Sequence, residues 1–174
     1  SAIQAALQPD PEPAFDLQAP EYYLNRELTW LAFNKRVLHE GQDDRNPLLE
    51  RVFFLAVVGA NLDEFFMKRI GGLKQQVGAG VRSLSVDGRL PQDQIDACHV
   101  VVREILDEQV LLAKELQLLL AGHNILIRKY KELEPEDKLI ADKYFRDEIY
   151  PLLTPQGMDP AHPFPFISNL SINL

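Results

Sequence analysis

The sequence predicts a mainly α-helical protein, in which an antiparallel helical bundle with one long helix precedes the truncated start of an α+β segment. Two observations lead to this fold class. Apolar residues recur at steps of three and four through most of residues 24–122, which is the period of amphipathic helices. Beyond Gly122, short β-branched or alternating segments lie among prolines, which is typical of mixed structure.

The composition excludes several classes of function. The chain has 174 residues, 46% hydrophobic and 25% charged, with a formal net charge of −8. An acidic chain without a cluster of cations repels nucleic acid, so we expect no nucleic-acid partner. No apolar run reaches the roughly 18 residues needed for a transmembrane segment. A single cysteine rules out an internal disulfide and favours a cytoplasmic location.

The first ordered element is expected to be a helix over residues 24–41. Residues 1–20 before it are rich in proline and lack periodicity, which predicts a disordered tail. Apolar residues cover more than half of the circumference of this helix, and Asn34 falls within the apolar arc. A buried amide must be satisfied, so we expect Asn34 to hydrogen-bond a neighbouring helix end or loop backbone, with ligand contact as the alternative. Pro47 is expected to begin a second, central helix.

The stretch "FLAVVGANLDEFFMKR" interrupts apolar residues with Asn61, Asp63 and Glu64. We interpret the interruption as a new helix, with Asn61 at the N-cap, Glu64 completing a capping box and Asp63 favourably placed in the first turn. The alternative is that the Asn61 amide faces a groove and reads a nucleobase edge. Glu64 and Lys68 should form a solvent-facing pair. The buried stripe is expected to comprise Leu62, Phe66, Ile70, Leu73 and Val77.

Arg69 lies at the edge of this stripe, beside aromatic residues. Such an arginine either extends past the aromatics to solvent or pairs with a buried acid. The alternative is a phosphate or interdomain contact, and the periodicity does not choose between these roles.

A Gly- and Ser-rich surface loop with a turn at Asp87-Gly88 should lead into the longest helix, from Pro91 to Gly122, with Gly122 at C′. This helix carries a heptad-type seam, which predicts packing along the bundle; self-association through the seam is the alternative. The seam comprises Ile95, Cys98, Val102, Ile105, Gln109, Leu112, Leu116 and Leu119.

The remaining residues predict a strand at 124–130, a helix at 134–150 and a strand at 167–174. A strand needs partners, so we expect the chain to be a fragment of a larger protein.

None of the four histidines (His39, His99, His123, His162) has metal-ligand spacing, and no phosphate loop or nucleophile motif is present. Cys98 should be a core residue beside a surface His99, and His162 a structural residue in a proline-rich turn. We therefore expect no catalytic residue and no metal site.

Two long segments nevertheless resemble a known family. "YYLNRELTWLAFNKRVLHEGQDDRNPLLERVFFLAVVGANLDEFFMKRIGGLKQQV" and, later, "YPLLTPQGMDPAHPFPFISNLSINL" closely resemble the N-terminal part of the bacterial polyphosphate kinases of the first type. The resemblance implies a helical N-terminal domain at residues 21–122 and the incomplete start of a head domain at 123–174.

The resemblance also implies a function. Enzymes of this family reversibly transfer the terminal phosphate of ATP to inorganic polyphosphate through a phosphohistidine with Mg²⁺, and they carry the histidine and the metal in C-terminal domains. It implies that this fragment is inactive alone, that the full-length protein binds ATP, ADP and polyphosphate, and that it is a homo-oligomer. The Asn of the family's Asn-Leu-Asp-Glu-Phe motif binds ATP at the adenine, which corresponds to Asn61 in "NLDEF".

Overall fold

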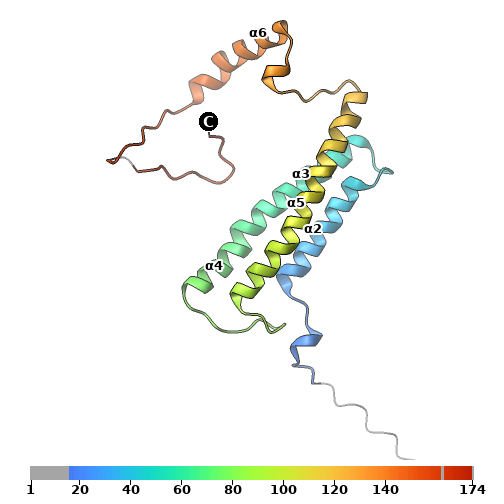
Figure 1. Ribbon diagram of the computed structural model, residues 1–174, viewed down its shortest axis with the longest axis vertical. Helices are drawn as coiled ribbons and strands as arrows, with labels where there is room; N and C mark the ends of the chain where they lie inside the picture. The colour runs from blue at the N-terminus through green and yellow to red at the C-terminus, as the bar shows by residue number, and fades with distance from the viewer. Residues whose placement is uncertain (1–15, 162, 174) are drawn as a thin grey trace, which may run out of the picture. The chain divides into compact units, whose positions relative to one another are not determined.

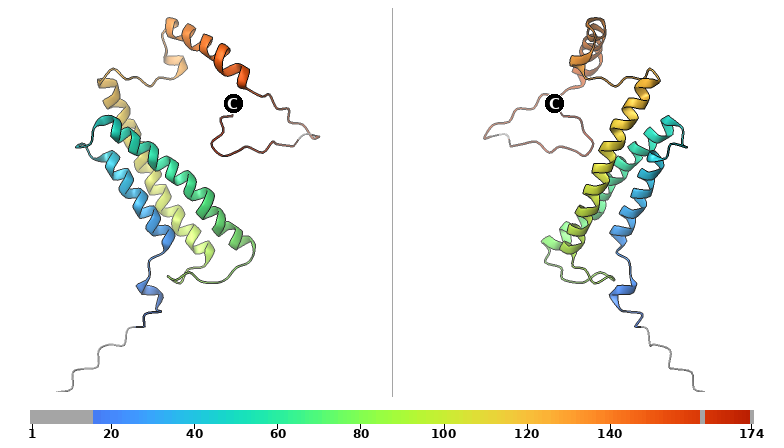
Figure 2. Two further views of the ribbon diagram at one scale, coloured as in Figure 1. Left: turned by 180° about the vertical axis from the view of Figure 1, so that it is seen from behind. Right: turned by 45° about the vertical axis from the view of Figure 1, so that its right-hand side comes forward.

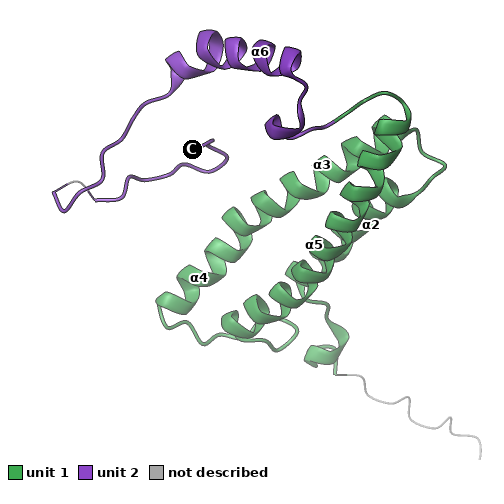
Figure 3. Cartoon of the chain, turned by 45° about the horizontal axis from the view of Figure 1, so that its top comes forward, with its two compact units in different colours: residues 1–126 green, residues 127–174 purple. Residues whose placement is uncertain are grey.

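The structure is a computed structural model that describes residues 16–161 and 163–173. Most of the expected N-terminal tail, and His162, lie outside the described residues. The chain divides into two compact units between Leu126 and Ile127, and each is described by itself (Figure 3).

The first unit is a bundle of three helical rods, which confirms the expected fold class (Figure 1). A 3₁₀ turn, η1 (Pro20–Tyr22), precedes α2 (Arg26–Gln42). The second rod joins α3 (Leu48–Phe65), a π-helical turn η2 (Phe66–Ile70) and α4 (Gly71–Gly78); we call residues 48–78 the α3–α4 rod. The third rod is α5 (Pro91–Gly122), whose bounds match the predicted long helix. The α3–α4 rod runs antiparallel to the other two (Figure 2).

The predicted helix start at Asn61 is wrong. Asn61 lies inside α3, so neither it nor Glu64 caps a helix, and Asp63 is not in a first turn. Gly59 does not break the helix and lies beside α5, since a Cβ there would lie 3.4 Å from Gln109 Nε2. The helix therefore continues through residues that resemble a break when only the sequence is considered.

The π-helical turn changes which residues of the rod face the core. Phe65 and Ile70 are both 1% exposed, although they are five residues apart, because a π turn advances the helix by one extra residue. The predicted stripe assumed an uninterrupted α-helix. Consequently Leu62, Ile70 and Leu73 are buried as expected, whereas Phe66 and Val77 are exposed.

The core lies between the three rods. The apolar members of the predicted α5 seam are buried from Ile95 to Leu116 and Gln109 is half-buried, but the last buried residue is Leu120 instead of Leu119. Gln109, its polar member, donates from Nε2 to the carbonyl oxygen of Leu55 at 3.2 Å. The seam thus packs inside its own bundle, as expected. The main cluster comprises Leu31, Leu38, Val58, Leu62, Phe65, Ile70, Leu73, Ile95, Cys98, Val102, Ile105, Leu112 and Leu116.

The left-handed residue that closes α5 is Asn124, two residues beyond the last helical residue, and not Gly122, which was predicted at C′. Asn124 adopts φ of 61°, the left-handed conformation that closes many helices. The amide of Ile125 donates to the carbonyl of Leu120 and that of Asn124 to the carbonyl of Ala121, both at 3.0 Å. Asparagine tolerates this conformation better than most residues, so it takes the place expected for glycine.

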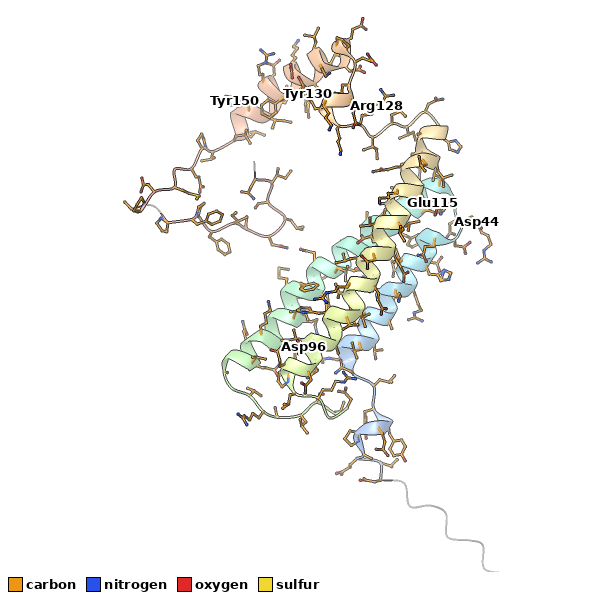
Figure 4. All side chains as sticks on the ribbon, in the orientation of Figure 1. Asp44, Asp96, Glu115, Arg128, Tyr130 and Tyr150 are labelled. Atoms are coloured by element: carbon orange, nitrogen blue, oxygen red, sulfur yellow. The ribbon has the colours of Figure 1, made fainter. Side chains whose placement is uncertain are left out.

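The second unit is helical where it is regular. It contains η3 (Tyr130–Glu132), α6 (Pro135–Tyr144), η4 (Phe145–Ile149) and η5 (Tyr150–Leu152). Tyr130, which is labelled in Figure 4, donates its hydroxyl to Asp142 at 2.7 Å. The predicted helix after Glu134 is confirmed. The two predicted strands are wrong, because residues 124–130 and 167–173 form no strand; β-branched and alternating sequences need a neighbouring strand to pair with.

A buried arginine holds the far end of α2 against both other rods. Arg51, 5% exposed, donates from Nε to the carbonyl oxygen of Gly41 at 2.8 Å and from Nη2 to Glu115 at 2.7 Å. Glu115 is labelled on α5 in Figure 4. The rods approach closely here: a Cβ on Gly41 would lie 3.0 Å from Leu112 Cδ2 and 3.3 Å from the Arg51 carbonyl oxygen. Only glycine fits between α2, α3 and α5 without displacing them.

We expect Gly41→Val to lower the free energy of unfolding by about 1–3 kcal/mol, because the added methyl groups overpack this crossing. Gly72→Val is the matched control, since no atom lies within 4 Å of a Cβ at Gly72 in α4, and it should be nearly neutral. Urea unfolding of both variants measures the difference. Equal losses in the two variants would contradict the proposed close crossing.

Candidate functional site

Two asparagines from different rods form an amide pair. Asn34 on α2 is 0% exposed; its Nδ2 donates to the carbonyl oxygen of Val58 at 3.3 Å, and its Oδ1 accepts from Asn61 Nδ2 at 2.9 Å. The expected backbone contact of Asn34 is therefore present, although its partner lies inside a helix and not at a helix end. Asn61 on α3 is half-buried, so the pair links the core to the surface.

Aromatic side chains form the layer next to the amide pair. Trp30 lies one turn before Asn34 on α2, and Phe65 lies one turn after Asn61 on α3. Their rings stack with centroids 4.9 Å apart and planes 15° apart. Phe66 meets the Phe65 ring edge-on. The stack fixes the spacing of α2 and α3 one turn from Asn61, so the amide pair sits on a rigid support.

Cys98 and His99 differ in environment although they are adjacent. Cys98 is fully buried, as expected of a core residue. Burial, together with the negative charge of Glu27, raises the pKa of its thiol to about 11, so the thiol is protonated and unreactive near neutral pH. His99 is half-buried against Phe66, with ring centroids 6.1 Å apart, and is less exposed than the surface residue we expected.

Arg69 pairs with a buried acid, which is one of the two structural roles expected for it. Its Nε donates to Glu27 Oε2 at 2.8 Å and its Nη2 to Oε1 at 2.5 Å. The side chain of Glu27 is 7% exposed and that of Arg69 35%. The hydrogen bonds that Arg69 donates to Glu27 raise the pKa of Arg69, against the opposing effect of burial. The pair ties the start of α2 to the α3–α4 rod.

A polar cluster that sequence reasoning missed surrounds Asn25. Its Oδ1 caps α2 by accepting from the amides of Glu27 and Leu28, and its Nδ2 donates to Asp87 at 3.0 Å and Gln94 at 3.1 Å. The loop before α5 is thereby fastened to both α2 and α5. An Asn directly before a helical period is an N-cap signal and could have revealed the cap, but not its distant partners.

The carboxylate of Asp87 is ionised at the centre of this cluster. Burial alone would raise its pKa, but hydrogen bonds from Ser85 and Asn25 and the charge of Arg89 outweigh burial and lower it. The Nε of Arg89 lies 2.8 Å from the Oδ2 of Asp87. The expected turn at Asp87-Gly88 is present, with Gly88 at φ of 78°. The cluster therefore has a complete set of partners and stabilises the loop.

Other candidate chemistry is limited in the described part of the chain. Glu64 and Lys68 form the expected exposed ion pair. No three His, Cys, Asp or Glu side chains among residues 16–161 and 163–173 are grouped to hold a metal ion. No helix within these residues is long and apolar enough to cross a bilayer.

Comparisons with known proteins match both units. The family model for the polyphosphate kinase N-terminal domain matches residues 23–128, and the one for the polyphosphate kinase middle domain matches residues 136–174. The polyphosphate kinase of Thermosynechococcus vestitus is 50% identical over 165 residues, and that of Synechocystis is 50% identical over 163 residues. These alignments cover 94% and 93% of this chain but only 22% of each relative, so the chain spans about a fifth of their length.

A solved structure supports the same relationship. The crystal structure of polyphosphate kinase from Porphyromonas gingivalis aligns with a TM-score of 0.60 and 27% sequence identity. The alignment covers 82% of this chain and 20% of that one.

We expect a double-mutant cycle of Glu27→Gln and Arg69→Met to give a coupling energy of about 1–3 kcal/mol, because the pair combines charge with two hydrogen bonds in a mostly buried setting. Urea unfolding of the two single variants and the double variant measures it. Glu64 and Lys68, both exposed, provide the control cycle, which should give about 0.3–0.5 kcal/mol. Similar couplings for the two pairs would show that the Glu27–Arg69 contact adds nothing beyond a surface pair.

The raised pKa of Cys98 predicts a loss of stability in alkali. The thiol keeps its proton in the folded chain up to about pH 11, whereas the unfolded chain loses it near the ordinary value of 9.0. Stability that depends on Cys98 is therefore complete below pH 9 and declines as the pH approaches 11. Unfolding free energies measured across this range should fall more steeply for the native chain than for Cys98→Ala. Parallel curves would contradict the shift.

Proposed function

The chain belongs to the polyphosphate kinase family, and on that premise we propose a role for its helical bundle. In a larger ATP:polyphosphate phosphotransferase, the bundle forms the wall of the ATP pocket that contacts the adenine. The full-length enzyme would reversibly transfer the terminal phosphate of ATP to inorganic polyphosphate through a phosphohistidine. We place that histidine and the Mg²⁺ outside residues 1–174, and we expect this segment to be inactive alone.

The observation that carries the proposal is the hydrogen bonding of Asn61. Its Nδ2 has two N–H groups, one of which donates to Asn34. Its Oδ1 makes no hydrogen bond to any residue that the structure describes. One donor and one acceptor on a half-buried amide therefore remain, and this pair matches the edge of adenine, which offers an amino group beside a ring nitrogen.

The charge distribution supports a division of labour with other domains. The formal net charge of −8 is unsuited to holding a polyphosphate chain, so we assign the phosphates to parts of the enzyme outside this segment. Two nitrogens of Arg69 are engaged by Glu27. This contact supports a role for Arg69 in holding the bundle together and leaves its third nitrogen for an interdomain contact.

The biological setting follows the family. We propose that the full-length protein is cytoplasmic, that it uses ATP and ADP as substrates, and that it assembles as a homo-oligomer. The α5 seam is buried in its own bundle, so assembly would use other surfaces.

We expect Asn61→Ala in the full-length enzyme to raise the KM for ATP about three- to tenfold, because one or two hydrogen bonds to the base are lost. Steady-state kinetics with ATP varied at saturating polyphosphate measures the change. Gln75→Ala, which removes an exposed amide from α4, is the control and should leave the KM unchanged. If Asn61→Ala has the ATP kinetics of the native enzyme, its proposed contact with adenine is wrong.

A further inference from the structure

We propose that Asn34 is a positioning residue that fixes which end of the Asn61 amide faces outward, and thereby selects a base with an amino group over one with a carbonyl at the same place. This inference rests on the proposed function, in which Asn61 contacts the base. It adds a specificity-determining role for a side chain that is itself fully buried.

The orientation is set by a group that can only accept. The carbonyl oxygen of Val58 has no proton, so Asn34 must present its Nδ2 to it, as the 3.3 Å contact shows. The Oδ1 of Asn34 is then directed at Asn61. Asn61 in turn must present its Nδ2, at 2.9 Å. The direction of donation is therefore transmitted from the backbone of α3 through two side chains to the surface.

Reversal of either amide is unfavourable because no solvent reaches Asn34. A reversed Asn34 would place its oxygen against the oxygen of Val58 and its nitrogen against the nitrogen of Asn61. Both contacts would be lost in a site where water cannot replace them. Leu31 and Leu38, one turn before and one turn after Asn34 on α2, are also 0% exposed, so this face of the helix lies in the core. The amide of Asn61 accordingly has one preferred orientation.

The fixed orientation has a chemical consequence for the base. The Oδ1 of Asn61 can only accept, so the base group opposite it must donate, as the 6-amino group of adenine does, while the remaining N–H of Nδ2 donates to the neighbouring ring nitrogen. Guanine carries a carbonyl at that position, and two facing acceptors repel each other. An unsupported Asn61 could rotate its amide and accept either base, so Asn34 is what makes the choice of ATP over GTP selective.

The chain offers a matched control for the loss of a buried amide. Gln109 also donates a side-chain amide to a carbonyl oxygen of α3, that of Leu55, at 3.2 Å. It lies on α5 and its hydrogen bond does not involve Asn61. Removing either amide perturbs the packing around α3, but only removal of Asn34 frees Asn61.

The test compares kcat/KM for ATP and for GTP in the full-length enzyme. Asn34→Ala should lower the ATP-to-GTP ratio roughly tenfold, the effect of one mispaired hydrogen bond. Gln109→Ala should leave the ratio unchanged. Asn34→Asp keeps an acceptor for Asn61 but sets a carboxylate against Val58, so it should retain the ratio while lowering the melting temperature. A purely structural role would not separate selectivity from stability in this way.

Several outcomes would overturn the inference. The inference is wrong if the native enzyme has equal kcat/KM for ATP and GTP. It is also wrong if Asn34→Ala leaves the ATP-to-GTP ratio unchanged, or if Gln109→Ala lowers that ratio as much as Asn34→Ala does. If Asn34→Asp loses selectivity together with Asn34→Ala, stability alone explains the effect. If Asn61→Ala raises the KM for ATP but Asn34→Ala keeps its ratio, only this inference fails. If Asn61→Ala leaves ATP kinetics unchanged, the proposed function itself fails.

Discussion

The hydrogen bond from Asn34 to the carbonyl oxygen of Val58 is the contact on which the geometry of the candidate site depends. It places a polar side chain in the middle of an apolar bundle, where burial without a partner is costly. The cost is offset because the amide is satisfied at both ends, by Val58 and by Asn61. The same requirement that stabilises the core therefore also orients the side chain that we propose meets the nucleotide.

The π-helical turn at Phe66–Ile70 allows the neighbouring layers to meet. Without the extra residue, Phe65 and Ile70 would not share one buried face. With it, Phe65 stacks on Trp30 while Arg69 reaches Glu27, on successive turns of α2. π-Helical turns occur frequently at functional sites, and this one begins at the residue that follows the NLDEF segment.

Polar clusters hold the bundle at both ends of α2. At its start, Asn25 links the helix to Asp87 and Gln94. At its end, Arg51 joins the carbonyl of Gly41 to Glu115. These contacts fix how far each rod can slide, because hydrogen bonds are directional whereas apolar contacts are not. A bundle clamped in this way presents Asn61 on a rigid surface.

The sequence by itself determined the helical bundle and the long helix, because a period of 3.6 residues is written in the order of apolar side chains. It also singled out Asn34 as a buried amide and Asn61 as a candidate reader of a base. Only the tertiary structure decided that α3 runs through Asn61 and that Asn34 is its partner. The hydrogen bond between Asn34 and Asn61 joins residues 27 positions apart on different rods. Local periodicity contains no information about which distant side chain will satisfy a buried polar group.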